Sequence, residues 1–178
     1  AIPNGIKFVY GTSWVGVPDT LGLTKRRHMS LIASNKRDLP GHQLRHEIIE
    51  DILVANLDVA LLGRGYAPFE QKSDGLAPYR FSVVIENTRA QNYFTEKIID
   101  AVLCETVPIY WGCPNIGDFM DTGGMVICQD AEDLRRAIRA ADVAQFEAKL
   151  PALRAAKPQA QHWADLFGRA ARAVLQSL

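Results

Sequence analysis

The chain has 178 residues, of which 48% are hydrophobic and 22% are charged. This composition is typical of a globular protein of one domain or slightly more, and it excludes an intrinsically disordered chain. Lysine and arginine together number 20, as do aspartate and glutamate, so no excess of charge predicts a nucleic acid or anionic lipid partner. No uninterrupted apolar run exceeds four residues, which excludes a membrane span within this sequence.

The cysteine content predicts neither a disulfide framework nor a zinc ribbon. Cys104, Cys113 and Cys128 are an odd, sparse set without a CxxC pair. We expect them to be small buried hydrophobic side chains in a reducing compartment.

Regular secondary structure is predicted from about residue 27 onward, because residues 1–25 are rich in glycine and show little periodicity apart from a short strand at 7–10. In chain order, the pattern predicts a strand at 29–34, a helix at 43–55, strands at 58–62 and 81–86, a helix at 93–105, strands at 107–111 and 125–128, and helices at 131–141, 143–156 and 161–178. Pro151 and Pro158 are expected to kink or break the helical stretch around them.

Strands that alternate with helices of 10–15 residues indicate βαβ units, and therefore an α/β fold with a Rossmann-like parallel sheet flanked by helices. Ligands of such sheets bind at the carboxyl ends of the strands. The segments that follow residues 34, 62, 85 and 110 are therefore the predicted places for a site.

The segment ENTRAQNYFTEK joins the 81–86 strand to the next helix. Its polar side chains are Glu86, Asn87, Tyr93, Thr95, Glu96 and Lys97. Free N–H groups at the helix N-terminus, together with Lys97, suit a phosphate, and Glu96 would accept hydrogen bonds from sugar hydroxyls. A structural interpretation stays open, in which Thr95 is only a helix cap and Glu96 and Lys97 are a solvated pair.

The segment NKRDLPGHQLRH follows the 29–34 strand and is basic. Lys36, Arg37 and Arg45 could face the same anion, and the fork of an arginine can make two parallel bonds to a diphosphate. The alternative is a solvated basic loop. His42 and His46 stand four apart, a spacing compatible with a metal, but no HExxH pattern surrounds them and we favour a non-metal role.

Several enzyme classes are disfavoured because their motifs are missing from the sequence. Neither GRG at 63–65 nor GCPNIG at 112–117 is a GxGxxG fingerprint or a P-loop, which argues against a dinucleotide dehydrogenase or a P-loop ATPase. No GxSxG elbow occurs, which argues against a nucleophilic hydrolase. The residues alone thus indicate an α/β domain with a cationic site for a nucleotide diphosphate that carries a polyhydroxylated group.

Residues 79–119, YRFSVVIENTRAQNYFTEKIIDAVLCETVPIYWGCPNIGDF, resemble the donor-binding region of the family-ten glycosyltransferases, the α-1,3/4-fucosyltransferases. The shared pattern is an aromatic-rich strand that ends in EN, then Y-x-T-E-K at the start of a helix, then T-V/I-P-I-Y-W-G. SLIASNKRDLPGHQLRHEI and GRGY upstream also resemble the family, and the similarity extends from about residue 27 to about residue 128.

The resemblance implies the C-terminal half of an inverting transferase of GT-B architecture, with C-terminal helices and with GDP-fucose as the donor. The implied donor-binding residues are Lys36, Arg45, Glu86, Asn87, Tyr93, Thr95, Glu96 and Lys97. Arg45 and Lys97 would neutralise the diphosphate, and Glu96 would hold fucose or ribose hydroxyls. Since these cations stabilise the charge that develops on GDP, we expect no metal and no cofactor.

In the family, an acceptor half precedes this domain and carries the carboxylate thought to act as general base. We therefore interpret residues 1–26 as a connecting segment from an acceptor half that is missing, truncated or on another chain, and residues 27–178 as the nucleotide-sugar-binding domain. The general base is not expected in this chain. The acceptor that the family implies is a glycan that contains N-acetylglucosamine.

Three alternatives stay open at this point. The chain could be a non-catalytic nucleotide- or sugar-binding module, a transferase that uses another nucleotide sugar, or a flavodoxin-like signalling scaffold, although a scaffold would need an acidic cluster at the strand ends. The absence of a signal or anchor segment favours a bacterial-type cytoplasmic protein at the inner face of the membrane, with the Golgi lumen as the alternative.

Overall fold

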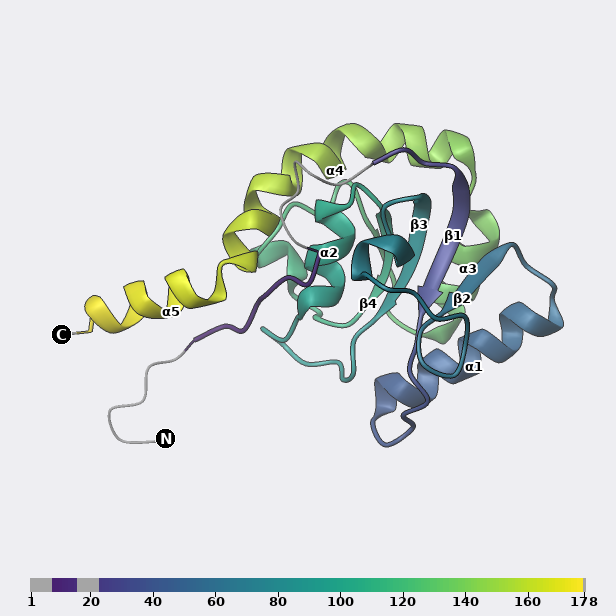
Figure 1. The fold of residues 1–178 in the computed structure, drawn as a ribbon, viewed down its shortest axis with the longest axis horizontal. Helices are drawn as coiled ribbons and strands as arrows, with labels where there is room; N and C mark the ends of the chain where they lie inside the picture. The colour runs from purple at the N-terminus through teal and green to yellow at the C-terminus, as the bar shows by residue number, and fades with distance from the viewer. Residues whose placement is uncertain (1–7, 16–22, 178) are drawn as a thin grey trace.

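The computed structural model describes residues 8–15 and 23–177. In this part of the chain, five parallel strands form one sheet in the order β2-β1-β3-β4-β5 (Figure 1). The strands are β1 (Arg27–Ile32), β2 (Val59–Leu62), β3 (Tyr79–Ile85), β4 (Val107–Trp111) and β5 (Val126–Ile127). The predicted α/β class with a parallel sheet is confirmed.

The helices account for most of the remaining chain. They are α1 (Pro40–Val54), α2 (Glu96–Leu103), α3 (Ala131–Ala140), α4 (Val143–Ala164) and α5 (Leu166–Leu175), with the short 3-10 helices η2 (Lys72–Gly75) and η3 (Ile116–Asp118). Among the described residues, no helix is both long enough and apolar enough to cross a bilayer.

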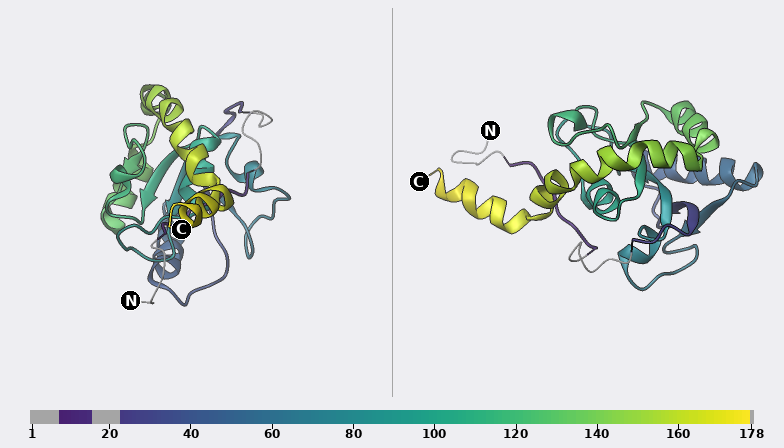
Figure 2. Two further views of the ribbon diagram at one scale, coloured as in Figure 1. Left: turned by 90° about the vertical axis from the view of Figure 1, so that its left-hand side faces the viewer. Right: turned by 90° about the horizontal axis from the view of Figure 1, so that it is seen from above.

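Helices cover both faces of the sheet (Figures 1 and 2). α1 and α3 pack together on one face, and α2 and α4 on the other. The chain moves from β1 to β2 in one direction and from β3 to β4 in the opposite direction, so right-handed crossovers place α1 and α2 on opposite faces. β3 and β4 are therefore covered on both sides, which explains why their residues are almost all buried and apolar.

The two prolines of the C-terminal region do not end a helix. α4 runs for 22 residues through Pro151 and Pro158, and the break falls at Asp165 instead. The predicted division into helices at 143–156 and 161–178 was therefore wrong. Both prolines lie on the exposed face, where water can reach carbonyls that have lost their N–H partner, while Leu153 and Ala160 on the other face are fully buried.

The N-terminal segment contains no strand in its described part. Lys7 lies outside the described residues, and the predicted strand is absent at 8–10. The carbonyls of Val9 and Gly11 instead accept hydrogen bonds of 3.0 Å each from the guanidinium of Arg169 on α5. A side chain thus takes the place of a strand partner, which a pattern search along the sequence could not detect.

All three cysteines are buried and free, as expected for small hydrophobic side chains. Burial raises the pKa of the Cys104 and Cys128 thiols to about 12 each, so both stay protonated at neutral pH.

Candidate functional site

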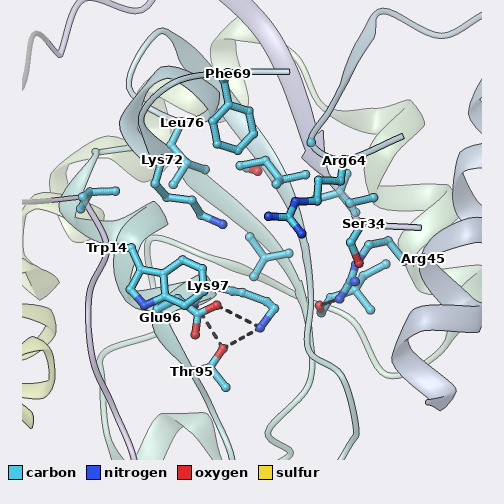
Figure 3. Close-up of a pocket in the computed structure, with 18 of the residues that line it drawn as sticks. Trp14, Ser34, Arg45, Arg64, Phe69, Lys72, Leu76, Thr95, Glu96 and Lys97 are labelled. Atoms are coloured by element: carbon cyan, nitrogen blue, oxygen red, sulfur yellow. Dashed lines mark hydrogen bonds and ion pairs between the residues drawn. The ribbon is translucent and has the colours of Figure 1, made fainter. Parts of the chain in front are cut away.

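A cavity of about 1090 Å³ opens at the carboxyl ends of β1, β2 and β3 (Figure 3). Its floor includes Ile32 and Ile85, the last residues of β1 and β3. The strand order reverses at this place, because the chain goes from β1 to β2 on one side and then returns to β3 on the other. Open parallel sheets bind ligands at such a switch point. The segments after the strands at 29–34, 58–62 and 81–86 all contribute to the cavity, whereas the segment after residue 110 does not.

The junction between β3 and α2 is fixed by a buried carboxylate. Glu86 follows the last residue of β3 and is 0% exposed. Its Oε1 accepts the backbone N–H of Thr95 at 2.9 Å, and its Oε2 accepts the Thr95 hydroxyl at 2.7 Å. Thr95 is the N-cap of α2, so Glu86 determines where that helix begins. Burial raises the pKa of Glu86, and Lys97 and Thr95 oppose this shift.

The first turn of α2 places the Glu96 carboxylate and the Lys97 ammonium group in the wall of the cavity. The Nζ atom of Lys97 lies 3.2 Å from Oε1 of Glu96, 3.0 Å from the hydroxyl of Thr95 and 3.4 Å from Oε2 of Glu86. Figure 3 shows the contacts of Lys97 with Glu96 and Thr95 at the cavity wall. Glu96 is buried and Lys97 half-buried, so water screens their charges only partly. The solvated pair considered for these two residues is therefore wrong for Glu96.

A close backbone contact between Gly41 and the end of β3 brings Arg45 to the same cavity. Gly41 donates its N–H to the carbonyl of Asn87, and a Cβ at Gly41 would lie 1.8 Å from the carbonyl oxygen of Glu86. One turn later, Arg45 is 6% exposed and its guanidinium donates to the carbonyl of Ile85. Arg45 thus turns inward to the end of β3. Burial lowers the pKa of Arg45, and the negative charges of Glu86 and Glu96 partly oppose this shift.

Most of the predicted site residues line this one cavity. They are Lys36, Arg45, Asn87, Thr95, Glu96 and Lys97. Glu86 lies behind the wall, and Tyr93 is half-buried in the loop before α2, outside the cavity lining. Arg37 is exposed and also outside it. The roles of these residues toward a ligand stay predictions.

Sequence reasoning missed several cavity residues. They include Tyr10, Trp14, Arg64, Phe69 and Lys72. Arg64 stands in the loop after β2, which was among the expected places, so its basic side chain was a usable signal. The position of Trp14 could not be predicted, because Asp100 of α2 determines it. Oδ1 of Asp100 accepts hydrogen bonds from the backbone N–H of Trp14 at 3.0 Å and from the Ser13 hydroxyl at 2.8 Å.

The two histidines of α1 make hydrogen bonds within the protein. Nδ1 of His42 lies 3.0 Å from Oδ1 of Asp38, and the ring of His46 bridges the Tyr66 hydroxyl and the Lys36 carbonyl at 3.0 and 3.1 Å. Both are buried. Within residues 8–15 and 23–177, no three His, Cys, Asp or Glu side chains gather as a metal site would require.

A family model matches residues 23–140, and its description is glycosyltransferase family 10 (fucosyltransferase), C-terminal. This segment includes the whole sheet, α1 and α2, and every predicted donor-binding residue.

Individual proteins agree with the family match over shorter stretches. The chain is 38% identical over 69 residues to an α-(1,3)-fucosyltransferase of Helicobacter pylori, which is 39% of this chain and 14% of that protein. It is 31% identical over 82 residues to a putative fucosyltransferase-like protein of Arabidopsis thaliana, which is 44% and 16% of the two chains. An α-(1,4)-fucosyltransferase of Arabidopsis thaliana is 42% identical over 45 residues, or 25% of this chain and 11% of that one.

Solved structures match a larger share of this chain. Crystal structures of α1,3-fucosyltransferase with GDP-fucose and with GDP both superpose with a TM-score of 0.58, at 29% and 28% identity. Each match covers 73% of this chain but only 39% and 38% of the solved chains. The chain therefore corresponds to well under half of these proteins.

Proposed function

We propose, from the premise that this chain belongs to glycosyltransferase family 10, that it forms the donor-binding half of an inverting enzyme that transfers fucose from GDP-fucose to a hydroxyl group of a glycan. The membership rests on the match over residues 23–140. The identity of the donor is supported by the solved relative that was crystallised with GDP-fucose. The preferred acceptor is a glycan that contains N-acetylglucosamine.

The observation that carries this proposal is the convergence of Arg45, Glu96 and Lys97 on one cavity at the switch point of the sheet. The two cations come from different helices and suit the two phosphates of a nucleotide diphosphate. The Glu96 carboxylate beside Lys97 suits the hydroxyl groups of a sugar or a ribose. Such a set matches a nucleotide sugar better than it matches a free nucleotide or a free sugar.

In the proposed reaction, an acceptor hydroxyl oxygen attacks C1 of fucose while the bond from C1 to the phosphate oxygen breaks. The electron pair of that bond leaves with GDP, and the acceptor proton passes to a base outside this chain. Negative charge grows on the departing diphosphate, so Lys97 and Arg45 stabilise the transition state more than the bound donor. Attack from the face opposite the leaving group inverts the configuration at C1.

Calorimetric titration of the chain with GDP, GDP-fucose, GDP-mannose and UDP-glucose tests the donor assignment. We expect GDP and GDP-fucose to bind, GDP-fucose to bind more tightly than GDP-mannose, and UDP-glucose not to bind. Equal affinity for GDP- and UDP-linked sugars would overturn the choice of nucleotide. Equal affinity for the two GDP sugars would overturn the choice of fucose.

A non-catalytic nucleotide-sugar-binding module is the second candidate. It is favoured by the engagement of both carboxylates at the β3–α2 junction, because Glu86 accepts from Thr95 and Glu96 pairs with Lys97, so neither is free to take a proton. Incubation of the chain with GDP-fucose and an N-acetyllactosamine acceptor tests the module. Fucosylated product would overturn the module, whereas binding of the donor without product is expected both of a module and of a donor half whose base lies outside this chain.

A further inference from the structure

Lys72 is a cation of the cavity that nothing in the family motif assigns. It stands at the start of η2, before β3, and its side chain enters the cavity from the wall opposite α1 (Figure 3). The side chain is half-buried. Among the residues that the structure describes, its ammonium group has neither a hydrogen bond nor an ion pair, whereas Lys97 has three oxygen atoms within 3.4 Å.

The charges around Lys72 act on its ammonium group from a distance, and the attraction by Asp100 and Glu96 exceeds the repulsion by Lys97 and Arg45. Its Nζ atom lies 5.8 Å from the centre of the Trp14 ring, a distance at which the ring face attracts a cation weakly. Asp100 and Glu96 attract the ammonium from farther than an ion-pair distance, and Lys97 and Arg45 repel it. Burial is the largest effect and lowers the pKa of Lys72.

A half-buried ammonium group without a counter-ion in direct contact is costly in the empty protein. An anion that enters the cavity between Lys72, Lys97 and Arg45 offsets this cost. We propose that Lys72 binds the diphosphate of the donor from the side opposite Arg45, so that the two phosphates lie between cations on facing walls. This inference rests on the proposed function for the identity of the nucleotide. The binding of a diphosphate group through Lys72 can be tested separately from that identity.

Trp14 and Asp100 position this lysine. Trp14 is 63% exposed, and its backbone is tied to Asp100 through the 3.0 Å hydrogen bond to Oδ1. The indole ring lies beside the Lys72 ammonium group, whose Nζ atom is 5.8 Å from the ring centre. Because its indole lies next to the proposed anion, Trp14 also supplies a fluorescence signal for binding.

The test uses the 178-residue chain, two substitutions at Lys72 and one control. Lys72→Met keeps the length of the side chain and removes the charge, whereas Lys72→Arg keeps the charge. Arg139→Met removes a charge from the exposed surface of α3, away from the cavity. GDP, GDP-fucose and inorganic pyrophosphate are titrated by calorimetry and by tryptophan fluorescence, at two salt concentrations, after the melting temperatures have been compared.

Lys72→Met is expected to melt no lower than the wild type and to bind all three ligands about tenfold more weakly, with a smaller dependence on salt. Lys72→Arg is expected to recover most of the affinity, and Arg139→Met to retain it. If Lys72 had only a structural role, its replacement would lower the melting temperature and leave the salt dependence of binding unchanged. Affinities of Lys72→Met that equal those of Arg139→Met would overturn the inference.

The outcomes also separate this inference from the proposed function. If the wild type binds GDP-fucose selectively and Lys72→Met binds it equally well, the function stands and the inference fails. If pyrophosphate binds through Lys72 but the nucleotides show no guanine preference, the inference stands and the proposed donor fails. A wild-type chain that binds neither pyrophosphate nor any nucleotide would overturn both.

Discussion

The carboxylate of Glu86 accepts two hydrogen bonds from Thr95, one from the Thr95 backbone N–H at 2.9 Å and one from the Thr95 hydroxyl at 2.7 Å. One buried side chain thus joins the end of β3 to the N-terminus of α2. Lys97 approaches the same carboxylate at 3.4 Å. Glu86 therefore supports the candidate donor site from behind, although it does not line the cavity.

Glu86→Ala is expected to lower the free energy of unfolding by about 3 kcal/mol, because it leaves the Thr95 N–H and hydroxyl without their buried acceptor. Glu86→Gln should cost less, since an amide oxygen can still accept one of the two bonds. Urea unfolding measures both. Glu50→Ala, at an exposed position of α1, is the control. A Glu86→Ala variant as stable as that control would contradict this role.

Asp100 is expected to make stability depend on pH between 3.8 and about 6, because burial raises its pKa from 3.8 to about 6. In that window the unfolded chain releases the proton while the folded chain keeps it, so the contribution of Asp100 to stability falls as pH rises and is constant above about 6. The loss is about 3 kcal/mol.

Asp100→Asn isolates this effect. Ser13 and Trp14 both donate to Oδ1, which an amide oxygen can replace, and the other carboxylate oxygen has no hydrogen-bond partner among the described residues. Urea unfolding at pH 4 and pH 7 should show a smaller loss of stability on going to pH 7 in the variant than in the wild type. Equal losses in the two proteins would contradict the prediction.

Gly41→Ala is expected to damage both stability and ligand binding, since the new Cβ would lie 1.8 Å from the carbonyl oxygen of Glu86. α1 would have to move away from β3, and Arg45 would move with it. Gly117→Ala is the matched control, because a Cβ there meets nothing within 4 Å. Thermal unfolding and GDP titration of the two variants check this. Wild-type behaviour of Gly41→Ala would show that the close contact is not needed.

Arg45→Lys is expected to weaken GDP binding by about tenfold although it keeps the charge. A lysine ammonium cannot donate to the Ile85 carbonyl and also present a planar fork to a phosphate. Calorimetry of this variant beside Arg139→Lys measures the effect. An unchanged affinity would mean that Arg45 acts only as a point charge.

The sheet and the cation-rich cavity were largely predictable from the sequence. Runs of β-branched residues marked the central strands, and the strand-to-helix junctions marked the cavity. The start of α2 was predicted three residues too early, at Tyr93, because the apolar stripe inside the helix does not mark the residue at which it begins. The chain turns at Asn92, whose φ is 61°, and Thr95 is the actual N-cap.

The remaining part of the site depends on contacts that are distant in sequence. Asp100, which is 86 residues later in the chain, determines the position of Trp14. Lys72 enters the cavity from a short 3-10 helix that the hydrophobic pattern of the sequence does not predict. The absence of a strand at residues 8–10 has the same origin, since Arg169 donates to the carbonyl of Val9 from 160 residues away. Side-chain contacts of this kind leave no local pattern in the sequence.

The central claim is that the β3–α2 junction binds the donor diphosphate, and the affinity of Lys97→Ala for GDP-fucose tests it most directly. Calorimetry should show a loss of about tenfold to a hundredfold, because one charge-assisted contact to the diphosphate disappears. Lys157→Ala, which removes a lysine paired with Glu105 outside the cavity, should bind like the wild type. Equal affinities of the two variants would contradict the placement of the donor at this junction.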